Sequence, residues 1–573
     1  MRRETAVPRR PKRSALKVTA AVVACLAGGL VGPSVTAAAR AAPYPARAAA
    51  SQEAPARAAA HRVPGTPANV DAASPAEDIT PAGLRAYGQS NVSIAASGRY
   101  VVEAWNDTTA LFTTCPSPKA QVTGLGFSSD GGKTFTDLTG LPDARCSQDN
   151  YQGYPSVVAY RAGGHTYFYI SSMFGNYFGR GRSFEALAAC QVTRSAGRAA
   201  LRCSQPVIAA ASSQCQLTGP SHRQRECDAM SGYLTIDPAR GRLYDAFTEY
   251  DLADGGAIEI SVCDLGTPAG RAGPAGGTPA APVCEHGTGL HKSGPNLLLG
   301  KPYLTIQQPD RHGCTYRGSY PAADTATGDL YVGYEYNLGG SLFPSGPCRA
   351  TPIQNIVTKV PRRCLALRAV SPCAGPAARA SVPITSMSTA TPPGYSTELG
   401  EPVDFPQLAV SHPAGTVTMV WNDARLHPYG DVLLQSFGLT SLRPVQARPV
   451  ALDAPHHGGM TFMPAVTATA AGLLDATWYA RDSLTTTYTA VKGTIGVSPR
   501  ATSTPATNIT ITSVASDWRH QVFDVLSNFG ERTDNALDAT STRPYVRSTL
   551  YVAWTDGRTG VPQPFAARLP AGR

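Results

Sequence analysis

The chain has 573 residues, more than one ordinary hydrophobic core can serve, because such cores stop growing near roughly 250–300 residues. Only 16% of the residues are charged, while glycine (55) and proline (48) are abundant. This composition excludes a helical bundle and favours many short strands joined by turns. The formal charge of +10 is concentrated in residues 1–41, which hold eight basic residues and one acidic residue. We therefore expect no nucleic-acid partner.

Residues 1–41 have the pattern of a secretory signal peptide. A basic stretch, 1–17, precedes an apolar stretch from Val18 to Thr36, and small residues that suit a signal peptidase follow at 37–41. We expect a secreted protein without a membrane span in the mature chain, and lipid anchoring at Cys25 is the alternative. Residues 42–84 are rich in alanine and proline, which predicts a disordered linker.

Twelve cysteines remain after the signal peptide, and an even number in an exported chain indicates disulfides. The simplest arrangement pairs consecutive cysteines: Cys115–Cys146, Cys190–Cys203, Cys215–Cys227, Cys263–Cys284, Cys314–Cys348 and Cys364–Cys373. We expect no metal site, because C-x-x-C spacing is missing and the neighbouring His456 and His457 would point opposite ways on an extended chain. No phosphate-binding or dinucleotide motif stands out, so no cofactor is expected.

A short apolar strand, a small turn, and a second strand ending on an aromatic and a polar residue recur seven times. The copies are 91–107, 154–171, 232–251, 320–337, 405–425, 463–482 and 534–558. Aromatic residues near the end of the second strand should pack between the repeats; they are Trp105, Tyr250, Tyr336, Trp421, Trp478 and Trp554. Alternating strands without a long 3.6-residue period predict an all-β array.

A repeat of about 70 residues fits one four-stranded blade with loop insertions, so the fold class we predict is all-β, a β-propeller. Seven copies predict seven blades over residues 85–571. Six blades are the alternative, if the first or last copy only completes a neighbouring sheet. Closing the ring buries both faces of each blade and leaves no long exposed sheet edge.

Residues 127–135 read FSSDGGKTF between two predicted strands. This segment resembles the Asp-box of the bacterial-neuraminidase repeat; the residues that carry the resemblance are Ser128, Asp130, Gly132, Thr134 and Phe135. Ser128 and Asp130 would bond turn amides, the glycines would permit positive φ, and Phe135 would plug the blade. V-W-x-D-x-R at 420–425 and V-x-W-x-D-x-R at 552–558 are also similar to secreted members of the sialidase-like propeller superfamily.

The resemblance implies a propeller whose Asp-box lies away from the catalytic face. It also implies, for active members, three arginines on a substrate carboxylate, a tyrosine nucleophile paired with glutamate, and an aspartate acid/base. The family's R-I-P type motif near the first blade is not found, and Arg85 is the only arginine just ahead of the first repeat.

Loops that enter the innermost strands of a propeller converge on one mouth of its axis, which would gather polar residues that open different repeats. We predict a site formed by Asp404, Asp228, Asp534, Arg317 and Arg532, with Tyr320, Tyr151 or Tyr316 as polar aromatic contacts. Carboxylates, arginines and tyrosines around one pocket are the groups that glycoside hydrolysis uses.

Two functions fit this site. One is a non-catalytic, monomeric propeller that binds a glycan or protein ligand at the cell surface. The alternative is an exo-sialidase-type glycoside hydrolase that acts on terminal acidic sugars. The Asp-box does not separate them, because both classes use it.

Overall fold

The computed structural model describes nineteen stretches of the chain. They are residues 65–79, 88–109, 121–142, 150–175, 182–211, 227–251, 255–266, 278–284, 304–307, 316–336, 353–365, 378–385, 405–427, 430–453, 459–483, 488–506, 508–517, 534–538 and 548–572. Contacts divide the chain into Met1–Ala49 and Ala50–Arg573, and every described residue belongs to the second unit. The signal peptide, most of the predicted linker, Asp404 and Arg532 lie outside the described residues.

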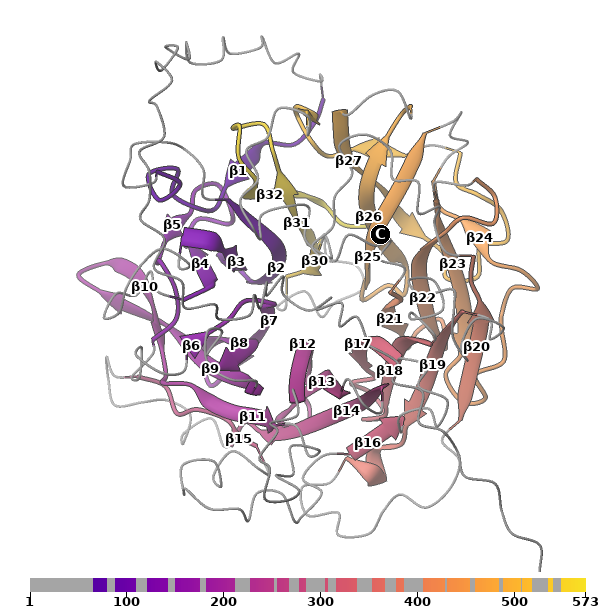
Figure 1. Ribbon diagram of the computed structural model, residues 1–573, viewed down its shortest axis with the longest axis horizontal. Helices are drawn as coiled ribbons and strands as arrows, with labels where there is room; N and C mark the ends of the chain where they lie inside the picture. Colours follow the sequence, from indigo (N-terminus) through magenta and orange to yellow (C-terminus); the bar gives the residue numbers. More distant parts are fainter. Residues whose placement is uncertain are drawn as a thin grey trace, which may run out of the picture. The chain divides into compact units, whose positions relative to one another are not determined.

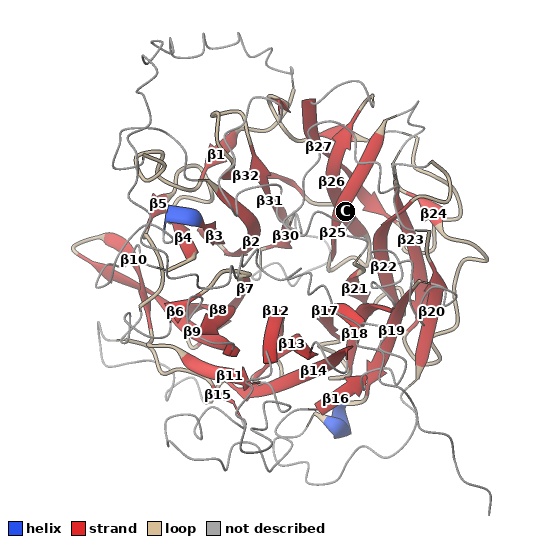
Figure 2. Ribbon diagram, viewed as in Figure 1, coloured by secondary structure: helices blue, strands red, loops and turns tan. Residues whose placement is uncertain are grey.

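The described residues form a seven-bladed β-propeller, which confirms the predicted fold class and decides for seven blades (Figures 1 and 2). Blade 1 contains β2 (Gln89–Ser97), β3 (Tyr100–Asp107), β4 (Thr123–Ser128) and β5 (Thr136–Asp137). Blade 2 contains β6 (Asn150–Tyr151), β7 (Ser156–Ala162), β8 (His165–Gly175), β9 (Arg182–Ser195), β10 (Arg198–Cys203) and β11 (Val207–Ala211). Blade 3 contains β12 (Cys227–Asp237), β13 (Arg242–Asp251), β14 (Gly255–Asp264), β15 (Val283–Cys284) and β16 (Leu304–Gln307).

The other four blades follow in chain order around the ring. Blade 4 contains β17 (Tyr316–Ala323), β18 (Leu330–Tyr336), β19 (Gln354–Val360), the 3-10 helix η3 (Arg362–Cys364) and β20 (Arg379–Pro383). Blade 5 contains β21 (Gln407–Ser411), β22 (Thr416–Asp423), β23 (Asp431–Gly438) and β24 (Val450–Ala451). Blade 6 contains β25 (Met460–Ala468), β26 (Leu474–Arg481), β27 (Tyr488–Val497), β28 (Ile509–Thr510) and β29 (Ser516–Asp517). Blade 7 contains β30 (Asp534–Leu537), β31 (Thr549–Asp556), β32 (Gln563–Pro570) and β1 (Asn69–Asp71).

The seven sequence repeats coincide with the two innermost strands of the seven blades, from β2–β3 in blade 1 to β30–β31 in blade 7. Strands within a blade pair antiparallel, as short hairpin connections require. Blades 2 and 3 share one continuous sheet, because β12 also pairs in parallel with β9 over two residues. The repeats therefore correctly predict which strands line the axis.

Strand β1 closes the ring, and it corrects the predicted linker boundary. Asn69–Asp71 pair with Phe565–Ala567 of β32, so the fourth strand of the last blade comes from the start of the propeller. The Asn69 side chain also donates to the Ile511 carbonyl and accepts from the Arg558 guanidinium, both at 3.0 Å. The linker predicted through residue 84 is thus too long, because a three-residue strand has no detectable periodicity in an Ala/Pro-rich sequence.

Among the described residues, a large hydrophobic cluster lies at each of the seven junctions between neighbouring blades. Trp105 packs against Tyr551 of blade 7, and Trp554 belongs to the cluster shared by blades 6 and 7. Trp105, Trp421, Trp478 and Trp554 are all fully buried, as predicted. Truncating one such side chain would cost about 3–5 kcal/mol, so these clusters hold the ring together.

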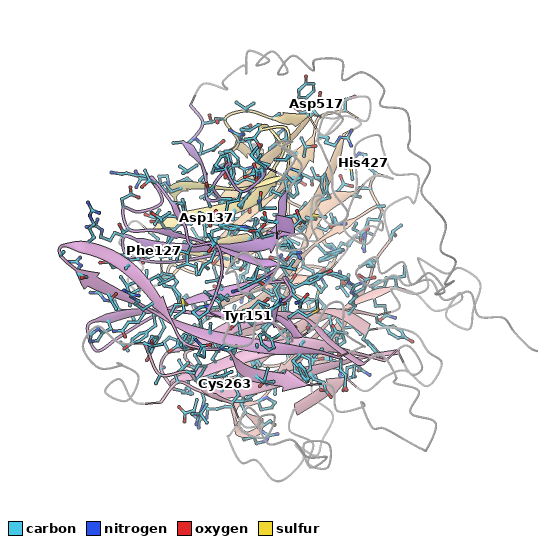
Figure 3. The ribbon with its side chains drawn as sticks, turned by 60° about the vertical axis from the view of Figure 1, so that its left-hand side comes forward. Phe127, Asp137, Tyr151, Cys263, His427 and Asp517 are labelled. Carbon is cyan, nitrogen blue, oxygen red and sulfur yellow. A yellow bond between two sulfur atoms is a disulfide. The ribbon has the colours of Figure 1, made fainter. Side chains whose placement is uncertain are left out.

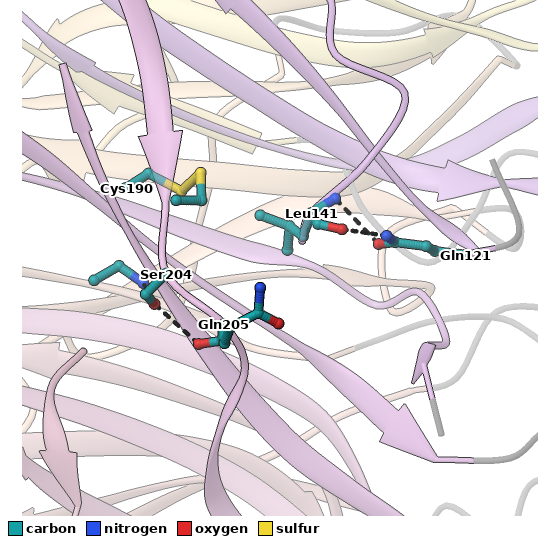
Figure 4. Close-up of a disulfide and its surroundings, with 7 residues drawn as sticks. Gln121, Leu141, Cys190, Ser204 and Gln205 are labelled. Carbon is teal, nitrogen blue, oxygen red and sulfur yellow. Dashed lines mark hydrogen bonds between the residues drawn. A yellow bond between two sulfur atoms is a disulfide. The ribbon is translucent and has the colours of Figure 1, made fainter. Parts of the chain in front are cut away.

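Two of the predicted disulfides lie within the described residues and are present: Cys190–Cys203 joins β9 to β10, and Cys263–Cys284 joins β14 to β15 (Figure 4 shows the first). Cys364 is also disulfide-bonded. Of the other predicted disulfide cysteines, Cys227 has only its backbone described, and the rest lie outside the description. No helix among the described residues has the length and apolarity that crossing a membrane requires.

Candidate ligand site at the axis of the propeller

The inner strands of all seven blades line one cavity on the axis, with a volume of about 450 Å³. Its wall consists of 93–96, 156–159, 233–236, 320–323, 407–410, 466–470 and 534–538. Six of these seven stretches begin with a polar or tyrosine side chain; these are Ser93, Ser156, Tyr233, Tyr320, Gln407 and Asp534. We call these six residues the polar ring. The wall beyond the ring is mostly Ala, Val, Leu and Ile, so side-chain polar groups concentrate at one end of the axis.

Hydrogen bonds between neighbouring inner strands hold the polar ring in place. The Val157 amide donates to Ser93 Oγ at 3.1 Å, and the Leu234 amide donates to Ser156 Oγ at 3.0 Å. The Ile94 amide donates to Asp534 Oδ2 at 2.9 Å, which links blade 7 back to blade 1. The ring is therefore fixed by the same contacts that join the blades, as a pre-organised binding site requires.

A repeated backbone irregularity places the ring residues. In blades 1, 4 and 6 a β-bulge leaves two residues of the inner strand without a partner in the second strand, and pairing resumes at Ser93, Tyr320 and Ala465. A residue with positive φ lies inside each bulge: Asn91 at 58°, Gly318 at 73° and Met463 at 50°. Asparagine and methionine reach this region only at some energetic cost, and such strain tends to occur at functional sites.

The two tyrosines of the ring form an aromatic group with Phe405, which lies beside the ring, in blades 3 to 5. The rings of Tyr233 and Tyr320 lie 5.0 Å apart between centroids. Both line a smaller hollow of about 10 Å³, together with Phe405, Asn422 and Met463. A Cβ at Gly318 would lie 2.5 Å from the Phe405 ring, so glycine lets the two strands approach this closely.

A buried arginine and a buried glutamate lie beside this aromatic group. Arg317 is the second residue of β17, is 5% exposed, and holds its guanidinium 5.5 Å from the centroid of the Phe405 ring. Glu335 of β18 is its register partner and is fully buried. Charged groups are buried at this depth only with compensating partners, and both residues have further interactions.

Among the residues predicted for the site, Tyr320 and Asp534 line the same axial cavity, and Arg317 precedes Tyr320 by three residues on β17. Asp534 also has a structural role, because Oδ2 accepts from Ser93 Oγ at 2.8 Å and from the Ile94 amide. The backbone of Asp228 pairs with Tyr250 and Ser183, and its side chain is outside the described part. Asp404 and Arg532 are outside it as well. Their catalytic roles remain predictions.

The other two tyrosines suggested for the mouth take part in packing. Tyr151 is fully buried, meets the Phe174 ring edge-on with centroids 5.2 Å apart, and belongs with Phe127 to the cluster between blades 1 and 2 (both labelled in Figure 3). Tyr316 stacks on Tyr336 with centroids 4.7 Å apart. Neither residue lines the axial cavity.

The sequence reasoning missed several buried carboxyls inside the second and third strands. Burial raises the pKa of Glu103 well above its ordinary value, and the charges of Asp71 and Asp534 add to the effect. Burial also raises the pKa of Asp245. Asp245 and Glu185 crowd the backbone of Gly232, where a Cβ would lie 2.8 Å from Asp245 Oδ1 and 2.7 Å from Glu185 Oε2. The sequence did contain a sign of these buried carboxyls, because single acidic residues occur within apolar segments such as 101–105 and 243–247.

These buried carboxyls do not line the axial cavity, where Asp534 and Asp538 are the carboxylates that the described residues contribute. Within the described ranges, no group of three His, Cys, Asp or Glu side chains is arranged to hold a metal ion. The described part of the site therefore offers hydroxyls, an amide, a carboxylate and aromatic faces. This set can bind a polyhydroxylated ligand.

The described residues thus define a seven-bladed propeller whose axial cavity is bordered by the polar ring. No protein-family model matches the chain, and no curated protein sequence matches it. Solved structures similar to it include an α-L-arabinanase of Penicillium chrysogenum complexed with arabinobiose, at 12% identity and a TM-score of 0.38, covering 88% of this chain and 99% of that one.

Two further similar structures come from other organisms. The Trypanosoma rangeli sialidase in complex with 2,3-difluorosialic acid is 11% identical with a TM-score of 0.37, covering 74% of this chain and 57% of that one. A subtype N11 neuraminidase-like protein of a flat-faced bat influenza virus is 8% identical with a TM-score of 0.34, covering 90% and 96%. At this level of similarity the comparison decides nothing about activity.

Proposed function

We propose that this protein is an exported propeller that binds carbohydrate at the polar ring. The observation that carries the proposal is the axial cavity, whose polar side chains come from six different blades and are held by inter-blade hydrogen bonds. Convergent polar groups in a pre-formed hollow are the usual mark of a small-ligand site. Disulfides at Cys190 and Cys263 agree with an oxidising compartment, where surface glycans are found.

The chemistry of the ring suits sugars. Ser156 and Gln407 can exchange hydrogen bonds with hydroxyl groups, and Ser93 and Asp534 can accept them. Tyr233 and Tyr320 present aromatic rings and hydroxyls side by side, which suits a ligand with one apolar face and a polar edge. A terminal sugar unit is therefore a better ligand for the ring than the flat surface of another protein.

Screening against a glycan array, followed by calorimetric titration with the best ligand, tests this proposal. Tyr320→Ala should weaken binding at least about tenfold, equivalent to about 1.4 kcal/mol. Tyr488→Ala is the matched control, because Tyr488 is 50% exposed and does not line the axial cavity. Equal affinities for wild type and Tyr320→Ala would contradict binding at the ring.

A sialidase-type glycoside hydrolase is the second candidate. Arg317, Tyr320 and Glu335 occur together on the β17–β18 hairpin, and they are the residue types that the resemblance implies for cleavage of acidic sugars. A fluorogenic sialoside assay tests this candidate. Turnover that is lost in both Tyr320→Phe and Glu335→Gln, with both variants folded, supports hydrolysis, and absence of turnover in the wild type excludes it.

A further inference from the structure

We propose that the end of the ring opposite the polar ring, at blades 7, 1 and 2, is a docking surface for an acidic polysaccharide. The surface, here called the cationic face, consists of Arg99, Lys133, Arg194, Arg198 and Arg568, all of them exposed. It lies where inner strands end, because Arg99 is in the turn that follows β2, whereas Ser93 of the polar ring is in the middle of that strand. The cationic face is therefore separate from the axial site.

Three of the five cations, Arg99, Lys133 and Arg568, meet around the turn between β4 and β5. The Gly131 amide donates to the Arg99 carbonyl at 2.8 Å, and the Arg99 side chain donates to the Ser129 carbonyl. Arg568, from blade 7, donates to the Gly131 carbonyl at 3.3 Å. Lys133 is part of the same turn. Arg194, from blade 2, donates to the hydroxyl of Tyr100 at 3.0 Å, so three blades contribute to one continuous surface.

These cations have no ion-pair partner among the described residues, unlike three basic residues of blades 3 and 4, Arg240, Arg242 and Lys359. There, Arg240 pairs with Asp237 at 2.9 Å, Arg242 with Asp264 at 2.8 Å, and Lys359 with Asp329 at 2.8 Å. A group of like charges without compensation lowers stability through mutual repulsion, and a bound anion relieves it. The grouping of unpaired cations from three blades points to an anionic partner for the cationic face.

The one acidic residue within the turn, Asp130, is engaged by the turn itself. Oδ1 accepts from the Lys133 and Thr134 amides at 3.0 Å, and Oδ2 accepts from Thr134 Oγ1 at 2.7 Å. Slight burial opposes the effect, but hydrogen bonds from Thr134, Ser128 and Lys133 lower the pKa of Asp130 to about 2. Its lone pairs are directed at these donors, which leaves the neighbouring side-chain cations available to a ligand.

Two arginines of the cationic face lie on a β-hairpin that a disulfide cross-links. β9 and β10 form a hairpin that extends beyond the ring at the left of Figure 1, and Cys190–Cys203 joins its two strands. Arg194 and Arg198 flank its turn, which Ala196 and Gly197 form with positive φ. A disulfide-fixed hairpin holds its arginines in place, which reduces the entropy lost on binding.

An acidic polysaccharide fits this surface better than a nucleic acid does. Single-stranded nucleic acid binds through exposed aromatic platforms as well as charge. Tyr100, which borders the cationic face, stacks on Phe127 with centroids 6.2 Å apart, and its hydroxyl accepts a hydrogen bond from Arg194. A surface of spaced guanidinium groups suits repeated carboxylates, which each arginine can hold with two parallel hydrogen bonds.

Binding to polygalacturonate, with neutral dextran and single-stranded DNA as comparison probes, tests the proposal. The triple variant Arg99→Ala/Arg194→Ala/Arg198→Ala should bind polygalacturonate at least about threefold more weakly than wild type, because three exposed cations that would pair with carboxylates are removed. The control triple Arg363→Ala/Arg443→Ala/Arg448→Ala removes the same charge from exposed residues of blades 4 and 5 and should bind within about twofold of wild type. Binding should also weaken from about 0.05 M to 0.3 M salt.

Three results would overturn the proposal: no binding of polygalacturonate at about 0.05 M salt, equal losses in both triple variants, or tighter binding of DNA than of polygalacturonate. Tyr320→Ala should leave polygalacturonate binding unchanged, so failure of this proposal and failure of the axial glycan site are distinguishable. Unfolding temperatures of all variants, measured in parallel, show whether a lost interaction reflects the surface or the fold.

Discussion

Asp423 and Asp556 occupy matching positions in blades 5 and 7, two residues after a buried tryptophan. Each accepts from the indole nitrogen of that tryptophan, at 2.9 Å in blade 5 and 2.7 Å in blade 7. Each also pairs at 2.6 Å with an arginine two residues further on, Arg425 or Arg558. These bonds explain the V-W-x-D-x-R pattern: the arginine compensates a carboxylate that closes the end of a strand.

Blade 1 has the same tryptophan and aspartate but threonine in place of the arginine, and this leaves Asp107 uncompensated. Its carboxylate accepts from the Thr109 amide at 2.9 Å. Burial nevertheless raises the pKa of Asp107 to about 7, although the hydrogen bonds from Thr109 act to lower it. Because the folded state then holds a proton that the unfolded state has lost, this residue makes stability fall as pH rises from about 4 to 7.

Asp107→Asn should remove this pH dependence. The free energy of unfolding of the variant, relative to wild type, should increase between about pH 4 and pH 7, by at most about 1.4 kcal/mol per pH unit. Urea titrations at several pH values measure the difference. A difference that does not change with pH would show that Asp107 titrates normally.

Gly232 offers a steric prediction at the same scale. Gly232→Ala would place a methyl group against the carboxyls of Glu185 and Asp245, both fully buried, and should destabilise the fold by roughly 1–3 kcal/mol. Gly438→Ala is the matched control and should be nearly neutral, because a Cβ there would lie 3.8 Å from Ser441 Oγ, an ordinary contact distance. Equal unfolding midpoints for the two variants would contradict the packing described around Gly232.

At the scale of elements, side chains that follow the buried aromatic residues connect each blade to the next. Asn106 Oδ1 accepts from the Tyr154 amide of blade 2 at 2.6 Å, and Asn422 Oδ1 accepts from the Met463 amide of blade 6 at 3.3 Å. In blade 6 the Tyr479 hydroxyl donates to the Thr555 carbonyl of blade 7 at 3.1 Å. The ends of the second strands thus connect neighbouring blades, at or just before the inner strand of the next blade for Asn106 and Asn422 and at its second strand for Tyr479.

The closing strand gives a prediction that separates two truncations. A chain that starts at residue 65 retains β1, whereas a chain that starts at residue 80 lacks it and leaves blade 7 with three strands. The shorter chain should lose at least about 2 kcal/mol of stability, because the backbone pairing with β32 and the Asn69 contacts are lost. Thermal unfolding of the two proteins checks this, and identical midpoints would contradict closure by β1.

The sequence was informative about the inner half of each blade and less so about the rest. The first two strands of every repeat were predictable, since both faces are buried and an aromatic residue ends the pattern. The register within each pair could not be predicted. Because of the β-bulges before Tyr233 and Tyr320, Phe247 and Tyr334 occupy the positions that tryptophans occupy in other blades, and Tyr250 and Tyr336 do not. Strand β1 escaped detection because three residues carry no period.

The candidate site was predictable in position and only partly in composition. Tyr320 and Asp534 were placed at the axis because inner strands of a propeller converge there. Tyr233 and Gln407 were missed, since nothing in one blade's sequence shows which residue of its inner strand reaches the cavity. That depends on bulges and on contacts with the next blade, which are properties of the closed ring.

At the scale of the whole molecule, the ring presents two chemically different ends. The polar ring combines hydroxyl, amide and aromatic groups around one cavity, and the cationic face carries uncompensated charge around one turn. The first suits a single sugar unit held in a hollow, and the second suits a long anionic chain that lies across a surface. A protein of this kind could hold a polymer at one end while the other end binds a terminal sugar.

Hydrogen–deuterium exchange with and without the best glycan ligand tests the central claim most directly, because it reports where the ligand lies without any substitution. We expect slower exchange in peptides that contain the starts of β17, β21 and β30, around Tyr320, Gln407 and Asp534, and unchanged exchange in the β4–β5 turn. Protection confined to outer strands, or to the turn that contains Asp130, would contradict binding at the axis.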